Sequence, residues 1–270
     1  MGASVRHPAV AGCFYPADAA TLLGDVRSYL SPAGATTPVL GCIAPHAGYV
    51  YSGAVAGAVY RTLEIPQRCI VMCPNHTGMG VPLSIMTEAA WETPLGCVPI
   101  ARSLGEALKK QYPRLTEDSA AHWREHGVEV QLPFLQARRP DVSFVPVALG
   151  TGQFEILEEL GEAMAEVLRA QAEPVLMIAS SDMNHYESDS ITRVKDHKAI
   201  DQIIALDARG LFDTVMREEI SMCGFGPTVV MLTAARRLGA TSAELIQYAT
   251  SGDASGDREM VVGYAGVVVR

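Results

Sequence analysis

The sequence predicts an α/β fold in which a central, largely parallel or mixed sheet carries helices on both faces. Three observations lead to this prediction. Short apolar runs alternate with longer helical patterns from about residue 39 to the C-terminus. The apolar runs are continuous rather than interrupted by polar residues, which is typical of strands buried on both faces. Helices must then cover both sides of the sheet, as in α/β proteins.

The position of each element follows from its apolar pattern. Residues 39–44 predict the first buried strand, and the helix after it covers 52–63. The helix at 153–170 has the clearest pattern, because residues such as Leu160 and Met164 recur at the spacing of one helical face. The other predicted elements are strands at 68–73, 142–149, 174–179, 243–250 and 260–269, helices at 198–216 and 227–238, and a polar loop at 251–257.

Length and composition indicate an ordered globular protein. The chain has 270 residues, of which 49% are hydrophobic and 19% charged, and we expect one domain over 1–270. The net charge of −9, without a basic block, argues against a nucleic-acid or membrane partner. No apolar run approaches the roughly 20 residues that span a bilayer. The six cysteines form no CxxC pair and no export segment is visible, so we expect a cytoplasmic location.

Polar clusters stand at four points where a predicted buried element ends or a helix begins. They occupy residues 45–49 (PHAGY), 74–78 (PNHTG), 180–185 (SSDMNH) and 223–227 (CGFGP). Ligands of open α/β sheets bind beyond the carboxyl ends of the strands. Three of these clusters carry a histidine directly after a strand, so their side chains are expected to converge on one point.

The residue types in these clusters predict a metal site. His46 and His76 are a natural pair of imidazole ligands for a divalent first-row metal. Cys223 precedes a predicted helix, whose N-terminus would favour a thiolate able to complete the site. Asp182 has three possible roles, as a metal ligand, as a partner that orients a histidine, or as a helix N-cap. His185 is the natural acid/base group beside an open coordination position.

A second histidine pattern competes with this interpretation. His122, Glu125 and His126 match HxxEH, the inverted zinc-protease signature, and would lie one helical turn apart. Only three positions of this pattern are fixed, and a proline follows that should kink or end the helix. We therefore favour a role for Glu125, His126 and Glu129 as a polar face of the same pocket, or as a solvated helix face.

Other sequence features carry less information. Tyr49 follows the first histidine cluster and either shapes the wall of a substrate pocket or caps the next helix. The sequence contains no GxxxxGK[ST] phosphate loop and no dinucleotide fingerprint after a strand. ATP and NAD chemistry are therefore disfavoured.

Taken in order along the chain, these motifs resemble those of the Memo family, also called AmmeMemoRadiSam system protein B. The resemblance extends over nearly the whole sequence. The matching segments are 6–16 (RHPAVAGCFYP), 44–53 (APHAGYVYSG), 74–78 (PNHTG), 125–136 (EHGVEVQLPFLQ), 180–185 (SSDMNH) and 223–227 (CGFGP).

The resemblance implies a fold and a metal centre similar to those of class III extradiol dioxygenases, which use non-haem iron. It implies that His46, His76 and Cys223 hold the metal, with Asp182 and His185 close by. Iron(II) is the expected metal. Because a cysteine stands where the dioxygenases have a glutamate, the softer thiolate makes copper or zinc alternative candidates.

Two functional hypotheses follow from the resemblance. The first is a metal-dependent redox or oxygenase-type enzyme in which His185 shuttles a proton. The second is a non-catalytic binding or adaptor protein that has kept the pocket, which the cysteine substitution favours. The resemblance further implies a small molecule or peptide as the bound ligand, and AMMECR1-type and radical-SAM proteins as partners.

Overall fold

The computed structural model describes residues 5–270 and contains a large mixed sheet with the strand order β10-β12-β2-β9-β3-β8-β4-β7, to which β11 is added beside β12. The four central strands are parallel to one another, as the continuous apolar runs indicated. These strands are β2 (Gly41–Ala44), β9 (Val175–Ser180), β3 (Arg68–Pro74) and β8 (Ser143–Leu149).

Antiparallel strands extend this centre on both sides. β12 (Val261–Val269) pairs with β2, and β4 (Leu83–Ile85) pairs with β8. A second, three-stranded sheet has the order β1-β5-β6. The remaining strands are β10 (His185–Glu187), β11 (Ala243–Thr250), β7 (Thr116–Glu117), β1 (Val5–Arg6), β5 (Ala90–Thr93) and β6 (Gly96–Pro99).

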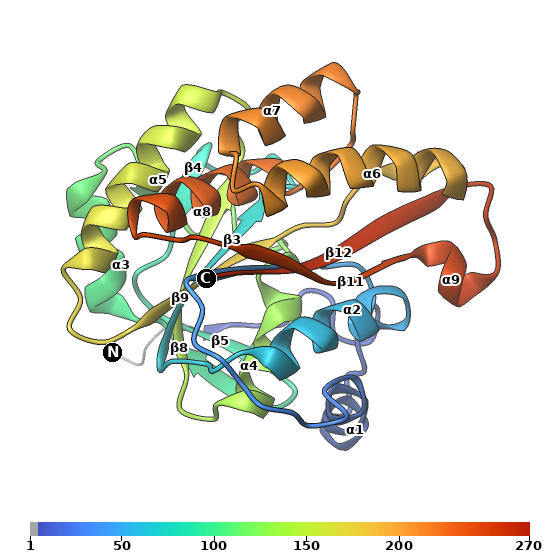
Figure 1. The fold of residues 1–270 in the computed structure, drawn as a ribbon. Helices are drawn as coiled ribbons and strands as arrows, with labels where there is room; N and C mark the ends of the chain where they lie inside the picture. Colours follow the sequence, from blue (N-terminus) through green and yellow to red (C-terminus); the bar gives the residue numbers. More distant parts are fainter. Residues whose placement is uncertain (1–4) are drawn as a thin grey trace.

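Helices cover both faces of the large sheet (Figure 1), which confirms the predicted fold class. On one face lie α3 (Arg102–Gln111), α5 (Phe154–Arg169), α6 (Asp189–Ile204), α7 (Ala208–Arg217) and α8 (Phe225–Arg237). The other face is covered by α1 (Ala19–Tyr29), α2 (Tyr49–Thr62), α4 (Leu132–Arg138) and the small sheet.

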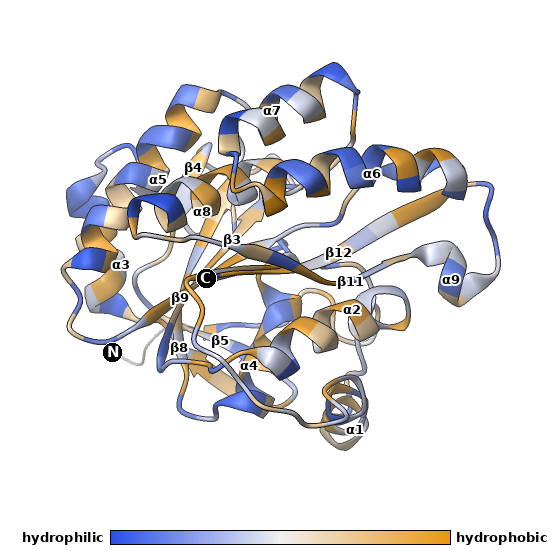
Figure 2. Ribbon diagram, viewed as in Figure 1, coloured by the Kyte–Doolittle hydropathy of each residue, from blue (hydrophilic) through white to orange (hydrophobic). Residues whose placement is uncertain are grey.

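Side-chain alternation along the central strands creates a hydrophobic core on each face. In β3, Ile70 and Met72 belong to the core under α5 and α8, whereas Cys69, Val71 and Cys73 belong to the core under α2 and α4. This two-sided burial makes the strands hydrophobic throughout, while the outer surfaces of the helices are polar (Figure 2). Residues 5–270 contain no helix with the length and apolar character required to span a membrane.

Three local predictions were wrong. The helix expected at 198–216 is two helices, because Leu206 has a positive φ of 56° and Asp207 caps α7 by accepting a hydrogen bond from the Gly210 amide. The loop expected at 251–257 contains the short helix α9 (Ser251–Ser255). Pro133 lies in the first turn of α4, so it starts a helix rather than ending one.

Candidate metal centre

His46 lies directly after β2, at the carboxyl end of the parallel strands, and is 2% exposed. Its backbone amide donates to the Asp182 carboxylate at 2.8 Å, which fixes the loop after β2 against the loop after β9. Its imidazole Nδ1 lies 3.0 Å from the Ser180 hydroxyl. Burial and the neighbouring His76 lower the pKa of His46 to about 3, so the ring is neutral.

The hydrogen bonds of Ser180 determine which nitrogen of His46 carries the proton. The Ser180 hydroxyl donates its only proton to the Gly127 carbonyl at 2.6 Å and accepts a bond from Gln131 Nε2 at 2.9 Å. It therefore has only a lone pair to offer His46, whose Nδ1 must be the donor. The His46 Nε2 atom is left without a proton, as metal ligation requires.

His76 follows β3 and is oriented in the same way by Glu125. The carboxylate accepts hydrogen bonds from the His76 Nδ1 atom and from the His76 backbone amide, each at 2.8 Å. A third bond, also 2.8 Å, comes from the Gly127 amide. Burial by itself raises the pKa of Glu125, but the bonds from His76 and Gly127 outweigh it and hold the pKa at about 2. The carboxylate is thus charged and engages the Nδ1 atom of His76, which leaves the Nε2 atom available as a metal ligand.

Gly127 connects these two supports. Its amide donates to Glu125, which orients His76, and its carbonyl accepts from Ser180, which orients His46. A Cβ atom at this position would lie 2.8 Å from the Cβ of Cys73, so the close approach of the backbone requires glycine.

Cys223 reaches the same point from the segment before α8. Its Sγ atom lies 3.1 Å from His46 Nε2 and 3.6 Å from the Asp182 carbonyl oxygen. Burial, followed by the nearby Asp182 carboxylate, raises the pKa of Cys223 well above its usual value. Without a bound metal, burial outweighs the helix N-terminus and favours the S–H form of Cys223, which donates to the unprotonated Nε2 atom of His46. The thiolate expected as a metal ligand stays a prediction.

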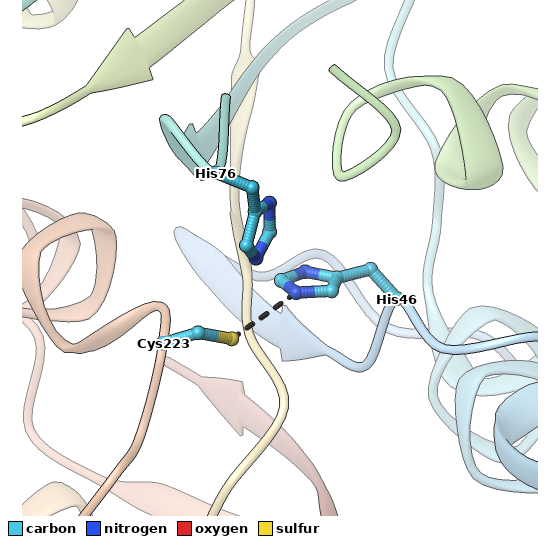
Figure 3. A group of neighbouring side chains, drawn as sticks. All are labelled: His46, His76 and Cys223. Atoms are coloured by element: carbon cyan, nitrogen blue, oxygen red, sulfur yellow. Dashed lines mark hydrogen bonds between the residues drawn. The ribbon is translucent and has the colours of Figure 1, made fainter. Parts of the chain in front are cut away.

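His46, His76 and Cys223 together form a candidate metal-ligand group (Figure 3). One ligand atom from each lies within 4.8 Å of the other two. Nitrogen and sulfur atoms bound to one ion at about 2.0–2.3 Å lie roughly 3–4 Å apart, so the 3.1 Å contact fits a shared ion. The two bare imidazole nitrogens and the sulfur are also the donors that iron, copper and zinc accept.

His126 lies beside this group and belongs to a second one, together with His76 and Glu125. Its ring stacks on His76 with the centroids 4.5 Å apart, and Phe14 packs near it at 4.8 Å. Burial, followed by the proximity of His46, lowers the pKa of His126 to about 4. The ring is therefore a neutral neighbour of the cluster, and its role as a pocket residue stays a prediction.

Asp182 lies on the loop after β9, and His185 is the first residue of β10. The Asp182 Oδ1 atom accepts from the backbone amides of His46 and Ala47 at 2.8 and 3.3 Å. The N-cap role considered for Asp182 is wrong, because the residues that follow form β10 rather than a helix. His185 Nδ1 lies 2.8 Å from the Ser221 carbonyl, which can only accept, so His185 Nε2 is unprotonated when the ring is neutral.

The HxxEH pattern does not form a metal pair. Residues 119–126 are turns and bends rather than a helix, so His122 and His126 do not share a helical face. His122 is fully buried, its Nε2 atom 2.9 Å from the Ser84 hydroxyl and its ring near Trp91. His122 belongs to neither candidate metal group of the described residues.

Glu129 has a structural role that the sequence patterns did not predict. Its buried carboxylate accepts hydrogen bonds from the Arg6 guanidinium, the Tyr15 hydroxyl and the amides of Ala9 and Val10. Glu129 therefore faces the N-terminal segment rather than the ligand cluster. Tyr49, also predicted for the pocket, donates its hydroxyl to the Val130 carbonyl at 2.6 Å.

Arg6 was not predicted as a site residue, although it opens the RHPAVAG motif. It is 2% exposed, and its Nη2 and Nε atoms donate to the carbonyls of Glu125 and His122 at 2.7 and 3.1 Å. Its guanidinium lies 4.3 Å from the centroid of the Trp91 ring. Arg6 thereby holds the segment that carries Glu125 and His126. Ser180 and Gln131 also lie in recognisable motifs, but nothing in their spacing indicated which side chains they would contact.

The fold and the cluster together define a mixed α/β protein with a candidate metal centre at the carboxyl ends of its parallel strands. Comparison with known families agrees with the motifs, because the model of Memo-like proteins matches residues 6–268. The chain belongs to the Memo-like protein family.

Similar proteins extend over the full length of the chain. A MEMO1 family protein of Methanothermobacter thermautotrophicus is 40% identical, over 97% of this chain and 99% of its own. One from Pyrobaculum aerophilum is 42% identical over 98% of both chains. Among solved structures, an uncharacterised Escherichia coli K12 protein covers 76% of this chain and 88% of its own, with 17% identity and a TM-score of 0.42.

Proposed function

We propose that this protein is a metal-dependent oxidoreductase of the oxygenase type, with iron(II) as its metal. The observation that carries the proposal is the convergence of His46 Nε2, His76 and Cys223 Sγ within 4.8 Å. Both imidazoles have their Nδ1 atoms occupied by Ser180 and Glu125, so both offer Nε2 to the same point. Bound iron with open coordination positions would supply redox chemistry between O₂ and a chelating substrate.

The residues around the cluster would divide the remaining work. His185 Nε2 is available to accept a proton from a bound substrate, because its Nδ1 proton is held by the Ser221 carbonyl. Asp182 holds the loop of His46 through two backbone amides, so its role in the proposal is to position a ligand. Glu125 would keep His76 oriented and raise its basicity.

Metal analysis after anaerobic purification tests this proposal and separates iron from copper and zinc. We expect close to one iron per chain in the wild-type protein, and oxygen consumption with a chelating aromatic diol. His46→Ala and Cys223→Ser should lose both, whereas His197→Ala, which changes an exposed histidine on α6, should lose neither. Stoichiometric zinc or copper without oxygen consumption would overturn the assignment as an iron oxygenase.

A second candidate function, a binding or adaptor protein, is supported by the exposed apolar side chains on the loops of the cluster. Trp123 and Tyr186 are 57% and 70% exposed and stand next to the segments that carry His126 and His185. Val50 and Met79 are also exposed, on the segments after His46 and His76. Exposed large apolar side chains are candidates for protein–protein contact when they form one patch.

For this second function we propose a peptide or an AMMECR1-type or radical-SAM protein as the partner, in the cytoplasm. A pull-down with these proteins separates it from the enzyme. Binding that survives Cys223→Ser but is lost in the double variant Trp123→Ser/Tyr186→Ser would support an adaptor. Binding that requires the metal ligands and not the exposed aromatic residues would contradict it.

A further inference from the structure

A hollow lies beside Phe14, close to the candidate metal centre. Its volume is about 460 Å³, and it forms where the N-terminal segment and α1 meet the start of α2. Phe14 is shared between the two regions, because it lines the hollow and also packs against His126. None of the three candidate metal ligands lines this hollow.

Four of the nine residues that line the hollow are aromatic. Besides Phe14, these are Tyr15, Tyr29 and Tyr49. The hydroxyl groups of Tyr15 and Tyr49 are already bonded to the Glu129 carboxylate and to the Val130 carbonyl. These two side chains are only 3% and 4% exposed, so the aromatic surface that a ligand can reach belongs mainly to the half-buried Phe14 and Tyr29, whose electron-rich rings attract cations.

Asp25 provides the only charge among the lining residues. Within residues 5–270, Asp25 is half-buried, and its carboxylate accepts no hydrogen bond and forms no ion pair. Tyr29 lies one helical turn further along α1, and burial together with the Asp25 charge raises the pKa of its hydroxyl. The hollow thus combines aromatic rings with a negative charge that nothing in the described chain neutralises.

We propose that this hollow binds a small organic ammonium ion. An alkylammonium group would pair with Asp25 and lie against the aromatic rings, and both interactions favour a cation over a neutral molecule of the same shape. An anion would face the carboxylate, and an uncharged ligand would leave it unpaired. The hollow takes no part in the metal cluster, so the proposal does not depend on the proposed oxidoreductase function.

Calorimetric titration of the full-length protein with choline, after treatment with a chelator, tests the proposal. We expect saturable binding of choline, and binding about tenfold weaker for its uncharged carbon analogue dimethylbutanol, because the analogue can neither pair with Asp25 nor make a cation–π contact. Chelation ensures that the choline hydroxyl does not bind a metal instead. Equal affinity for the two compounds, or no saturable binding of choline, would overturn the proposal.

The variant Asp25→Asn shows whether binding occurs in this hollow. Its folding should be unchanged, because the carboxylate has no partner in the described chain, and the unfolding midpoint verifies this. Choline affinity should fall about tenfold, whereas Glu158→Gln, which removes an exposed carboxylate lining a different hollow, should leave it unchanged. Unchanged affinity in Asp25→Asn, or an equal loss in both variants, would refute the assignment.

Discussion

At the scale of single residues, the orientation of the candidate ligands is decided by groups that lie behind them. Ser180 and Glu125 each accept the Nδ1 proton of one histidine and so direct the Nε2 atom toward Cys223. Such supports fix both the tautomer and the direction of a ligand, and their loss commonly lowers metal affinity by about 10–100-fold. Two predictions follow for these supporting residues.

Ser180→Ala should weaken metal binding without removing a ligand. The variant deprives His46 Nδ1 of its acceptor and leaves the Gly127 carbonyl unpaired, so we expect Zn²⁺ affinity to fall about 10–100-fold in a competition titration against a chromophoric chelator. Ser84→Ala is the matched control, because Ser84 is also buried and also bonds a histidine, His122, outside the cluster. An equal loss in both variants would indicate general destabilisation instead.

Glu125→Gln should have a similar effect through His76. A neutral amide cannot accept all three N–H groups that the carboxylate now accepts, so the His76 ring loses its fixed orientation. We expect about a 10–100-fold loss of Zn²⁺ affinity in the same titration. The control is Glu88→Gln, which changes an exposed glutamate and should leave the Zn²⁺ affinity unchanged. If Glu125→Gln also leaves the Zn²⁺ affinity unchanged, the Glu125 carboxylate does not support the site.

At the scale of elements, the N-terminal segment is tied to the site through Arg6. Its guanidinium bonds the Glu129 carboxylate and the carbonyls of His122 and Glu125, so it spans the segment that supplies Glu125 and His126. The segment that carries Glu125 and His126 continues to Gln131, whose Nε2 atom donates to the Pro45 carbonyl at 2.9 Å and so contacts the loop after β2. The described residues before α1, 5–18, are therefore part of the scaffold of the candidate metal centre.

Arg6→Ala should destabilise the protein strongly. It leaves Glu129 buried without its cationic partner, and breaking a buried ion pair on one side costs about 3–5 kcal/mol. We expect a decrease of that size in the free energy of unfolding measured with urea. Arg27→Ala, which changes an exposed arginine on α1, should differ from the wild type by less than about 0.5 kcal/mol. A comparable loss in Arg27→Ala would contradict the role assigned to the buried pair.

At the scale of the whole molecule, the stability of the fold should depend on pH through Asp196. This carboxyl group is buried, accepts hydrogen bonds from the Asn184 amide and the Tyr248 hydroxyl, and has its pKa raised by burial to about 7. Between about pH 4 and about pH 7 the folded protein retains a proton that the unfolded chain has lost. Asp196 should therefore contribute a fall in the free energy of unfolding as the pH rises through this window, whereas the buried His46 and His126, whose pKa values are lowered, contribute a rise.

Asp196→Asn should remove this dependence. The slope contributed by one proton is at most about 1.4 kcal/mol per pH unit, and urea denaturation at a series of pH values would measure it. Asp201→Asn changes an exposed carboxylate on the same helix, α6, and should keep the wild-type slope. A wild-type slope that persists in Asp196→Asn would assign the effect to another group.

The sequence was sufficient to predict the fold class and the candidate ligands, but not the contacts that orient them. Buried parallel strands are continuously apolar, and the histidines follow them directly, so both features are local in sequence. The partners of Ser180, Glu125 and Arg6 lie tens to more than a hundred residues away, and no spacing rule encodes such contacts. The break at Leu206 was missed because the apolar periodicity continues across it.

Gly127 links the orientations of the two histidine ligands, which the three donor residues alone would not do. One residue's amide and carbonyl hold the supports of two different imidazoles, and no larger residue fits against Cys73. A shift of the backbone at Gly127 would therefore displace the supports of both rings together. Re-engineering the centre for a metal of different geometry would have to begin with the backbone at this glycine, and swapping a donor side chain alone would not be enough.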